Sequence, residues 1–456
     1  MNPAGPKLLL ISDGPGTATG LGGQSLLVYE AAVEAGFQVL VANLCIQEDR
    51  PFPPPFFHAG GMIPEYLVDV PLRADQLGYV LAEFEPDHIV ALCDGWMLGA
   101  MVSMPRRVRE KLHFWTTADH EFFPESFRVL VESAASLVFM AEFGRDSWGP
   151  GLDRKGKRTI MIPHAVEGSI FRPYPIGSPA ADRVEKAKRF FGVDGHFVAL
   201  HIGRNQHRKQ QPLLIEGWSR FVQRLAPQDR AKVTLYLHTE EHGAMLAAVN
   251  GDPYMNVMSV LMSGWNLPRY IARNYSAEIA KTIRFSERGG PRDAVAEMHN
   301  VSDVHVSASC GEGFGVCTIE AQACGRAVII SDNTTTPELV GGRDAGKGLH
   351  GSVYEPGASL GVAPFGWRVP CSSFFVQPDF SGKRPLIDVD RLADALHDAW
   401  SFWRAGELNT AAAVARRQEW TLARYEWLAV KNRWKALFAE IVAGNVDGLG
   451  PRAEVK

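Results

Sequence analysis

Two glutamates, Glu312 and Glu320, frame a glycine-rich turn in the second half of the chain. Three glycines fall within five residues there, so the backbone can lie close to a ligand. The residues from Val316 onward have the apolar spacing of a helix, whose free first-turn amides would face the turn and bind an anion. Carboxylates accept hydrogen bonds from hydroxyl groups. The pattern predicts a site for a ligand that carries phosphates and sugar hydroxyls; two unrelated solvated acids are the alternative.

The elements around this turn can be predicted from hydrophobic runs. Residues 304–307 form a short β-branched run typical of a buried strand. A helix should cover residues 316–324, because Gly325 stands where a helix end favours a left-handed residue. The run that begins at Ala327 predicts the next buried strand. The turn therefore lies between a strand and the start of a helix, which is where helix amides meet a bound anion.

Two cations stand in a similar position after another strand. Residues 197–201 predict a buried strand, and Arg204 and Lys209 follow it, ahead of a helix that tolerates Pro212 in its first turn. Both side chains can therefore reach the anion site beside Glu312. Ordinary surface charges are the alternative interpretation, since this spacing of Arg and Lys is common.

The chain opens with a second glycine-rich stretch. Residues 7–12 predict a strand, residues 25–35 a helix and residues 37–43 a second strand, with Gly22 and Gly23 in the first connection. The spacing is Gly-x-Gly-Gly rather than Gly-x-Gly-x-x-Gly, and the second strand ends at an asparagine instead of an acid. A dehydrogenase is therefore disfavoured. The two glycines belong either to a ligand-binding turn or to a plain tight turn.

Polar residues also follow the predicted strand at 113–117. Asp119, His120 and Glu121 stand at the carboxyl end of that strand, where open α/β sheets bind their ligands. His120 is the candidate for a role in binding or catalysis; a loop histidine without a role is the alternative. A basic cluster at 106–111 is typical of a solvated helix face, and contact with an acceptor or a membrane is the less favoured interpretation.

Composition bounds the class of protein. The 456 residues suffice for two domains with separate cores, and 46% hydrophobic and 21% charged residues are typical of a soluble globular protein. A formal charge of -4 gives no overall attraction to nucleic acid or anionic lipid. The six cysteines form no Cys-x-x-Cys pair, which favours buried thiols in a reducing compartment over disulfides or zinc. With no long apolar run and no signal peptide, a cytoplasmic location without stable membrane insertion is expected.

The stretch from Glu312 to Glu320, Glu-Gly-Phe-Gly-Val-Cys-Thr-Ile-Glu, resembles the paired-glutamate signature of the retaining glycosyltransferases of family 4. Residues 337–340, Pro-Glu-Leu-Val, also fit that family's pattern. Arg204 and Lys209 match its Gly-Arg-x-x-x-x-Lys pattern. The resemblance covers nearly the whole chain and is strongest between residues 196 and 340.

The resemblance implies the GT-B fold, an α/β architecture with two Rossmann-like domains facing each other across a cleft. Residues 1–166 would form the acceptor-side domain, joined by a C-terminal helix at about 425–446. Residues 167–424 would form the domain that binds the donor nucleotide.

The resemblance also implies an activity: transfer of a sugar, a hexose by expectation, from a nucleoside-diphosphate sugar to an acceptor hydroxyl with retention of anomeric configuration. Arg204 and Lys209 would grip the diphosphate, Glu320 would bind the ribose and Glu312 the transferred sugar. UDP- or GDP-sugars are the expected donors. No metal is expected, on the premise that the chain lacks a carboxylate cluster suited to Mg²⁺ or Mn²⁺. The implied catalytic set is Glu312, His120, Arg204 and Lys209, and the implied donor-binding set is Gly22, Gly23, Arg204, Lys209, Gly313, Phe314, Gly315, Val316 and Glu320.

Three other functions fit part of the pattern. A glycoside hydrolase also uses paired carboxylates but has no need of Arg204 and Lys209. A nucleotide-sugar epimerase of the same fold would convert the donor without an acceptor, and a non-catalytic binding protein would turn over nothing. The acceptor itself stays open among a glycan, a lipid-linked sugar, a small metabolite and, less favoured, a hydroxymethylated DNA base. Acidic residues outnumber basic ones in the first 165 positions, which disfavours a polyanionic acceptor.

Overall fold

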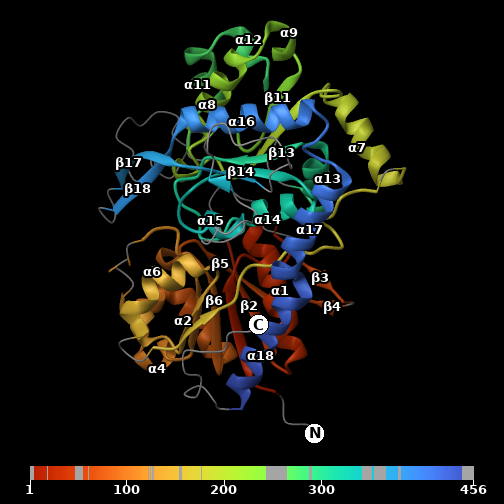
Figure 1. The fold of residues 1–456 in the computed structure, drawn as a ribbon. Coiled ribbons are helices and arrows are strands. Elements are labelled where there is room, and N and C mark those ends of the chain that lie inside the picture. Colours follow the sequence, from red (N-terminus) through yellow and green to blue (C-terminus); the bar gives the residue numbers. More distant parts are fainter. Residues whose placement is uncertain are drawn as a thin grey trace. The chain divides into compact units, whose positions relative to one another are not determined.

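The chain forms two compact units, Met1–Ala165 with Tyr425–Lys456, and Val166–Arg424 (Figure 1). They are seen in a computed structural model that describes residues 5–17, 19–46, 55–59, 61–121, 123, 125, 128–153, 157–175, 177–242, 264–286, 290–340, 352–353, 366–377 and 382–443. Residues 444–446 of the expected C-terminal helix lie outside these ranges.

The first unit is built on a seven-stranded parallel sheet. Its strand order is β5-β2-β1-β6-β7-β8-β9. The central strands are nearly continuous apolar runs, as expected for a parallel sheet that is covered on both faces. The strands are β1 (Lys7–Ser12), β2 (Gln38–Ile46), β5 (Glu65–Asp69), β6 (His88–Cys93), β7 (Leu112–Thr116), β8 (Ser136–Phe139) and β9 (Thr159–Met161), and a small hairpin joins β3 (Phe57–His58) to β4 (Gly61–Met62).

Helices from both ends of the chain contribute to this unit. The last helix, α18 (Trp427–Val442), packs on the first, α1 (Gly20–Glu34). The ammonium of Lys431 lies 3.2 Å from Glu30 and 2.8 Å from Glu34 on α1. The remaining helical segments are α2 (Ala74–Phe84), η1 (Gly95–Leu98), α3 (Gly99–Ser103), α4 (Arg106–Arg109), α5 (Arg128–Ser133) and α6 (Glu142–Asp153).

Several side chains of the basic cluster at 106–111 make hydrogen bonds or ion pairs within the first unit. The Arg109 guanidinium donates to the Ser133 hydroxyl and to two backbone carbonyls of the preceding turn. Lys111 donates to the Pro86 carbonyl at 2.8 Å, and Arg106 pairs with Glu110 one helical turn away. Three of its cations therefore make contacts within the first unit. This favours a helix face over a contact with an acceptor or a membrane.

The second unit is built on another seven-stranded parallel sheet, of order β12-β11-β10-β13-β14-β16-β15. Its core buries Trp218 and Trp367 completely. The strands are β10 (Phe197–Ile202), β11 (Val233–His238), β12 (Ile283–Ser286), β13 (Val304–Ser307), β14 (Ala327–Ser331), β15 (Ser352–Val353) and β16 (Gly366–Val369), and β17 (Cys371–Gln377) pairs with β18 (Gly382–Ile387) in an antiparallel hairpin. Two parallel α/β sheets confirm the predicted fold class.

The helices of the second unit alternate with its strands. Between them they cover the sheet, and α16 packs against α8. The helical segments are α7 (Pro179–Phe190), η3 (His207–Lys209), α8 (Gln211–Arg224), α9 (Pro227–Arg230), α11 (Leu267–Asn274), α12 (Ala277–Ala280), α13 (Arg292–Val301), α14 (Val316–Ala323), α15 (Thr336–Leu339), α16 (Val389–Arg404) and α17 (Ala411–Tyr425). Among the described helices of the whole chain, none is both long enough and apolar enough to cross a membrane.

Candidate active site

The glycine turn of the second unit joins β13 to the start of α14. Gly315 is the N-cap of α14 and has a φ of 101°, a left-handed conformation that side chains rarely adopt. A Cβ atom there would lie 3.1 Å from the Leu339 side chain. Because glycine has no side chain to cap the helix, no side-chain acceptor from the cap meets the first-turn amides, and the Thr318 amide donates to the Gly315 carbonyl at 3.0 Å. The turn therefore has the geometry of an anion site.

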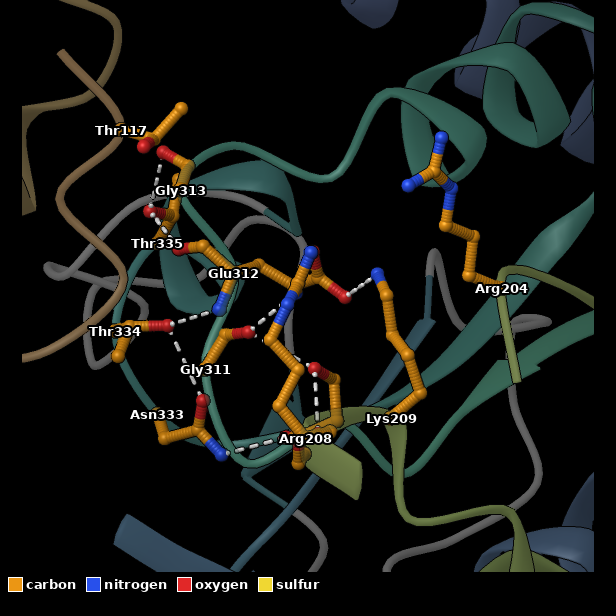
Figure 2. Close-up of polar contacts among 12 residues, drawn as sticks. Thr117, Arg204, Arg208, Lys209, Gly311, Glu312, Gly313, Asn333, Thr334 and Thr335 are labelled. Carbon is orange, nitrogen blue, oxygen red and sulfur yellow. Dashed lines mark hydrogen bonds and ion pairs between the residues drawn. The ribbon is translucent and has the colours of Figure 1, made fainter. Parts of the chain in front are cut away.

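Glu312 lies within this turn and is 8% exposed. One carboxylate oxygen lies 2.5 Å from the Lys209 ammonium, and the other lies 3.2 Å from the Arg208 guanidinium. Figure 2 shows both cations directed at the carboxylate. The structure thus brings Glu312 and Lys209 together, two residues that the sequence singles out, and adds Arg208, which it does not.

The electrostatics of this cluster favour the charged form of Glu312. Burial alone would raise the pKa of the carboxyl, but the Lys209 ammonium and the Arg208 guanidinium outweigh it and lower the pKa of Glu312 to about 2. Burial and the neighbouring Arg208 lower the pKa of Lys209. Glu312 is therefore a fixed negative charge at any physiological pH.

The two cations come from the connection between β10 and α8. Arg208 and Lys209 lie in the 3-10 turn η3, and the Arg208 carbonyl accepts the Cys310 amide at 2.8 Å. The Arg208 guanidinium also donates to the Gly311 carbonyl at 3.0 Å. Arg204 lies earlier in the same connection, and its side chain extends away from Glu312 in Figure 2. Arg208 and Lys209 are thus the two cations at the Glu312 carboxylate, and the role of Arg204 and Lys209 toward a diphosphate stays a prediction.

Residues that follow β14 form hydrogen bonds with the other side of the glycine turn. The Thr334 hydroxyl accepts the Glu312 amide at 3.0 Å. The Thr335 hydroxyl lies 2.8 Å from the Glu312 carbonyl and 3.1 Å from the Gly313 carbonyl. Sequence reasoning missed both threonines, because only the pairing of β13 with β14 brings them beside the turn.

Glu320 lies on α14, past the turn. Its carboxylate is 4.0 Å from the Nε2 atom of His299, a fully buried residue on α13. Phe314, in the turn itself, is buried, with 4% of its surface exposed. Glu320 is partly exposed, so its carboxylate remains accessible to a ligand hydroxyl.

In the first unit, Gly22 and Gly23 lie within a helix and not in a loop. The helix α1 begins at Gly20 instead of residue 25, because the Thr19 hydroxyl accepts the Gly22 amide at 3.0 Å and caps it. A Cβ atom on Gly22 would approach the Thr17 hydroxyl to 2.3 Å, so only glycine fits. The two glycines therefore lie in the first turn of a helix, where the Gly22 amide donates to the Thr19 hydroxyl and the Gly23 amide to the Thr19 carbonyl at 3.3 Å.

Asn43 explains why the second strand does not end at an acid. Its side-chain oxygen accepts the Gly14 amide at 2.7 Å, and its side-chain nitrogen donates to Glu65 at 2.8 Å. An amide can make both bonds, whereas a carboxylate cannot donate to Glu65. Asn43 thus holds the first turn of the chain in place.

His120 is a buried residue of the first unit. Its ring lies 5.5 Å from that of Trp148, and its Nε2 atom is 3.8 Å from the Asp119 carboxylate. The Trp148 indole donates to the His120 carbonyl at 3.1 Å. These contacts orient the imidazole at the end of β7, and its role in the reaction remains a prediction.

Within the described ranges, no group of three or more His, Cys, Asp and Glu side chains is arranged to hold a metal. The sequence-based premise that the chain lacks a carboxylate cluster needs one correction, because Asp388 and Asp390 form an Asp-x-Asp pattern. In the structure both of these carboxylates bond to protein groups. Asp388 caps α16 by accepting the amides of Asp390 and Arg391, and Asp390 pairs with Arg220 at 2.8 Å.

Known proteins resemble this site and its fold. Residues 183–359, which contain both glutamates and the cationic connection, match the family model "Glycosyl transferases group 1". This segment of the chain is similar to the group 1 glycosyltransferases. D-inositol 3-phosphate glycosyltransferases are similar to part of this chain: that of Geodermatophilus obscurus is 28% identical over 174 residues, or 38% of this chain and 32% of that protein. That of Corynebacterium aurimucosum is 28% identical over 175 residues, or 38% of this chain and 36% of that protein.

Solved structures extend the likeness to both units. Sucrose-phosphate synthase from Thermosynechococcus elongatus has a TM-score of 0.64 and 17% identity, covering 96% of this chain and all of that chain. The HepE protein of Anabaena, solved in complex with UDP and glucose, has a TM-score of 0.60 and 16% identity, covering 96% of this chain and all of that one. The predicted GT-B fold is therefore confirmed for this chain. The chain spans about half or less of the length of the curated relatives that it matches.

Proposed function

We propose that the chain transfers a hexose from a nucleoside-diphosphate sugar to an acceptor hydroxyl with retention of anomeric configuration. The observation that carries the proposal is the buried Glu312 carboxylate, fixed between Lys209 and Arg208 in a glycine turn at the start of α14. A fixed negative charge beside an anion site suits a ligand in which a diphosphate leaves and positive charge develops on the sugar.

A UDP-sugar is the first donor to test. HepE, which shares the fold, has been solved in complex with UDP-glucose, and an Escherichia coli trehalose-6-phosphate protein of TM-score 0.60 has been solved with UDP-2-fluoro glucose. A GDP-sugar is the second candidate. Glu320, partly exposed on α14, is positioned to accept hydrogen bonds from the donor ribose.

The proposed reaction needs stabilisation of the departing diphosphate. Lys209 and the first-turn amides of α14 supply positive charge and donors within one loop system, and Arg204 adds a cation from the same connection. Glu312 would act on the other partner of the breaking bond, the anomeric carbon. The roles implied for the first unit stay predictions: Gly22 and Gly23 toward the diphosphate, and His120 toward the sugar or acceptor.

The alternatives differ in what they require of Glu312. A glycoside hydrolase needs one carboxylic acid that is protonated at working pH. The pKa of Glu312, about 2, does not allow that role. A nucleotide-sugar epimerase would share the diphosphate contacts but would convert the donor without an acceptor. We propose a reducing, cytoplasmic setting, because three of the described cysteines are buried within the fold.

The test is incubation of the purified chain with labelled UDP-glucose, UDP-N-acetylglucosamine and GDP-mannose, each with a panel of hydroxyl-bearing acceptors. Transfer would give a labelled acceptor adduct and free nucleoside diphosphate. An isomerised donor with no adduct would instead identify an epimerase. Binding of donor without any product across the panel would identify a binding protein.

We further propose that the transfer needs no divalent metal, because Lys209, Arg204 and the α14 amides provide the positive charge that a metal would otherwise supply. Activity should survive exhaustive treatment with EDTA. Complete loss of activity that Mn²⁺ or Mg²⁺ restores would contradict this part of the proposal.

A further inference from the structure

Thr334 has a backbone conformation that its side chain opposes. Among the described non-glycine residues, positive φ occurs only at Ala59, Glu85, Gln210 and Thr334. Thr334, at a φ of 45°, is the β-branched member of this group, and such residues rarely adopt the left-handed region. Gln210, at 51°, directly follows Lys209. Two of the four strained residues thus flank the Glu312 ion pairs, which is where stored backbone strain indicates a functional constraint.

The Thr334 side chain makes a directional contact with the turn. Its hydroxyl donates to the Asn333 side-chain oxygen at 3.2 Å and accepts the Glu312 amide at 3.0 Å. The Asn333 side-chain nitrogen in turn donates to the Ser309 carbonyl at 2.9 Å. Figure 2 shows this chain of contacts running from Asn333 through Thr334 to Glu312. The amide of the functional glutamate is therefore fixed to the residues that follow β14.

The neighbouring threonine holds the other side of the same residue. The Thr335 hydroxyl lies within hydrogen-bond distance of the Glu312 and Gly313 carbonyls, and Thr335 itself has ordinary helical angles. The chain turns at residues 332–335. With Thr334 in the left-handed and Thr335 in the right-handed helical region, both hydroxyls reach the glycine turn. The strained conformation is thus what lets two adjacent residues clamp the backbone of Glu312 on both sides.

We propose that Thr334 is a positioning residue for Glu312, and that its strain is retained because the hydroxyl fixes the direction of the carboxylate. This inference rests on the proposed function, in which the Glu312 charge acts on the anomeric carbon. It goes further by assigning the orientation of that charge to the side chain at 334. The diphosphate contacts of Lys209 and the α14 amides do not depend on this bond, so donor affinity and turnover should separate.

Three substitutions test the proposal. Thr334→Val keeps the shape and the strain but removes the acceptor for the Glu312 amide. Thr334→Gly removes the acceptor and the strain together. Thr334→Ser keeps the hydroxyl. Val and Gly should each lower kcat about tenfold, the rate equivalent of one hydrogen bond, with nucleoside diphosphate affinity unchanged. Ser should restore kcat to near the original value.

Thermal stability separates positioning from a merely structural role. Relief of strain offsets the lost hydrogen bond in Thr334→Gly, so we expect its Tm to stay near that of the original chain while kcat falls. Glu85→Gly is the matched control, because Glu85 is another left-handed residue, at φ 49°, at the end of α2 in the first unit. That variant should be at least as stable and should keep full turnover.

A second readout does not depend on turnover. Hydrogen exchange of the peptide that spans 308–316, measured by mass spectrometry, should be faster in Thr334→Val and Thr334→Gly than in Thr334→Ser. Full kcat in the Gly variant, a Ser variant as slow as Val, or unchanged exchange in Val would overturn the inference. Absence of turnover in the original chain with every donor and acceptor would instead sink the proposed function, and the exchange data would still decide the role of Thr334.

Discussion

The Lys209 ammonium lies 2.5 Å from the Glu312 carboxylate, although 103 positions separate the two residues in the chain. They meet because β10 and β13 are parallel neighbours, so that the connections after the two strands share one edge of the sheet. A cation from one connection and an acid from the other thus form a single charged element. Loss of either charge would therefore leave the other buried beside one partner fewer.

Removal of Lys209 should affect both binding and folding. We expect Lys209→Met to weaken nucleoside diphosphate binding about tenfold or more, the range for a charge-assisted hydrogen bond. It should also lower the free energy of unfolding by about 2 kcal/mol, because Glu312 stays buried and keeps its ion pair with Arg208 but loses the one with Lys209. Titration calorimetry and urea denaturation measure the two effects. Lys431→Met, which breaks half-buried ion pairs in the first unit, should cost stability but leave diphosphate affinity unchanged; equal loss of affinity in both variants would remove Lys209 from the site.

Substitution of Glu312 and substitution of Glu320 should have different kinetic effects. Glu312→Gln removes the fixed charge beside the anomeric carbon, so kcat should fall by on the order of tenfold to a thousandfold, the range for one electrostatic stabiliser, with diphosphate affinity nearly intact. Glu320→Gln weakens ribose contacts that ground and transition states share, so the donor KM should rise. Glu216→Gln on α8 serves as a control for the substitution itself. Equal loss of diphosphate affinity in the first two variants would contradict this division.

Stability should fall as the pH drops below 6.5. Burial lowers the pKa of His113 and His164 to about 3 and that of His201 to about 4. Below pH 6.5 the unfolded chain takes up protons that the native state refuses, so each buried histidine removes about 1.4 kcal/mol of stability per pH unit. Urea denaturation between pH 7.5 and pH 5 measures the slope. His113→Asn should reduce it by one histidine's share, and an unchanged slope would mean that His113 is protonated in the native state.

Position 22, in the first turn of α1, should tolerate no side chain. Gly22→Ala places a Cβ atom 2.3 Å from the Thr17 hydroxyl and 2.5 Å from the Thr17 carbonyl, and we expect it to lower the free energy of unfolding by about 1–3 kcal/mol. Gly78→Ala is the matched control, since Gly78 lies inside α2 with no atom within 4 Å of its added Cβ. Alanine there should raise stability by up to about 1 kcal/mol. Thermal unfolding measures the stability of both variants. An equal change in stability for Gly22→Ala and Gly78→Ala would contradict the prediction.

The buried strands and the loop between them could be predicted from the sequence. The runs at 7–12 and 304–307 coincide with β1 and β13, because a strand buried on both faces needs a continuous apolar run. The helix after the glycine turn begins at Val316 as predicted and ends one residue short of the predicted end. The start of α1 could not be placed, since its glycines have low helix propensity and the cap at Thr19 and the packing around it decide the matter.

The partners of Glu312 could be predicted only in part. Lys209 belongs to a recognisable sequence pattern, Gly-Arg-x-x-x-x-Lys, whereas Arg208 beside it has no place in that pattern and resembles an ordinary surface charge. Thr334 and Thr335 gave no signal, because their contact with the turn depends on the pairing of β13 with β14 and on an unusual φ at residue 334. Such contacts are set by tertiary structure, and a single sequence does not encode them as a local pattern.

The first unit is built from two separate segments of the chain, and this has a consequence during synthesis on the ribosome. Trp434 and Phe438 of α18 are fully buried, and their rings lie 5.0 Å from Trp115 and 5.3 Å from Phe37. These residues emerge only after the whole of Val166–Arg424 has been translated. The second unit, which is continuous in the chain, can complete its core first, whereas the nascent first unit exposes an apolar face until α18 arrives. Chaperones that recognise exposed apolar segments should therefore bind the N-terminal half of the nascent chain until translation nears its end.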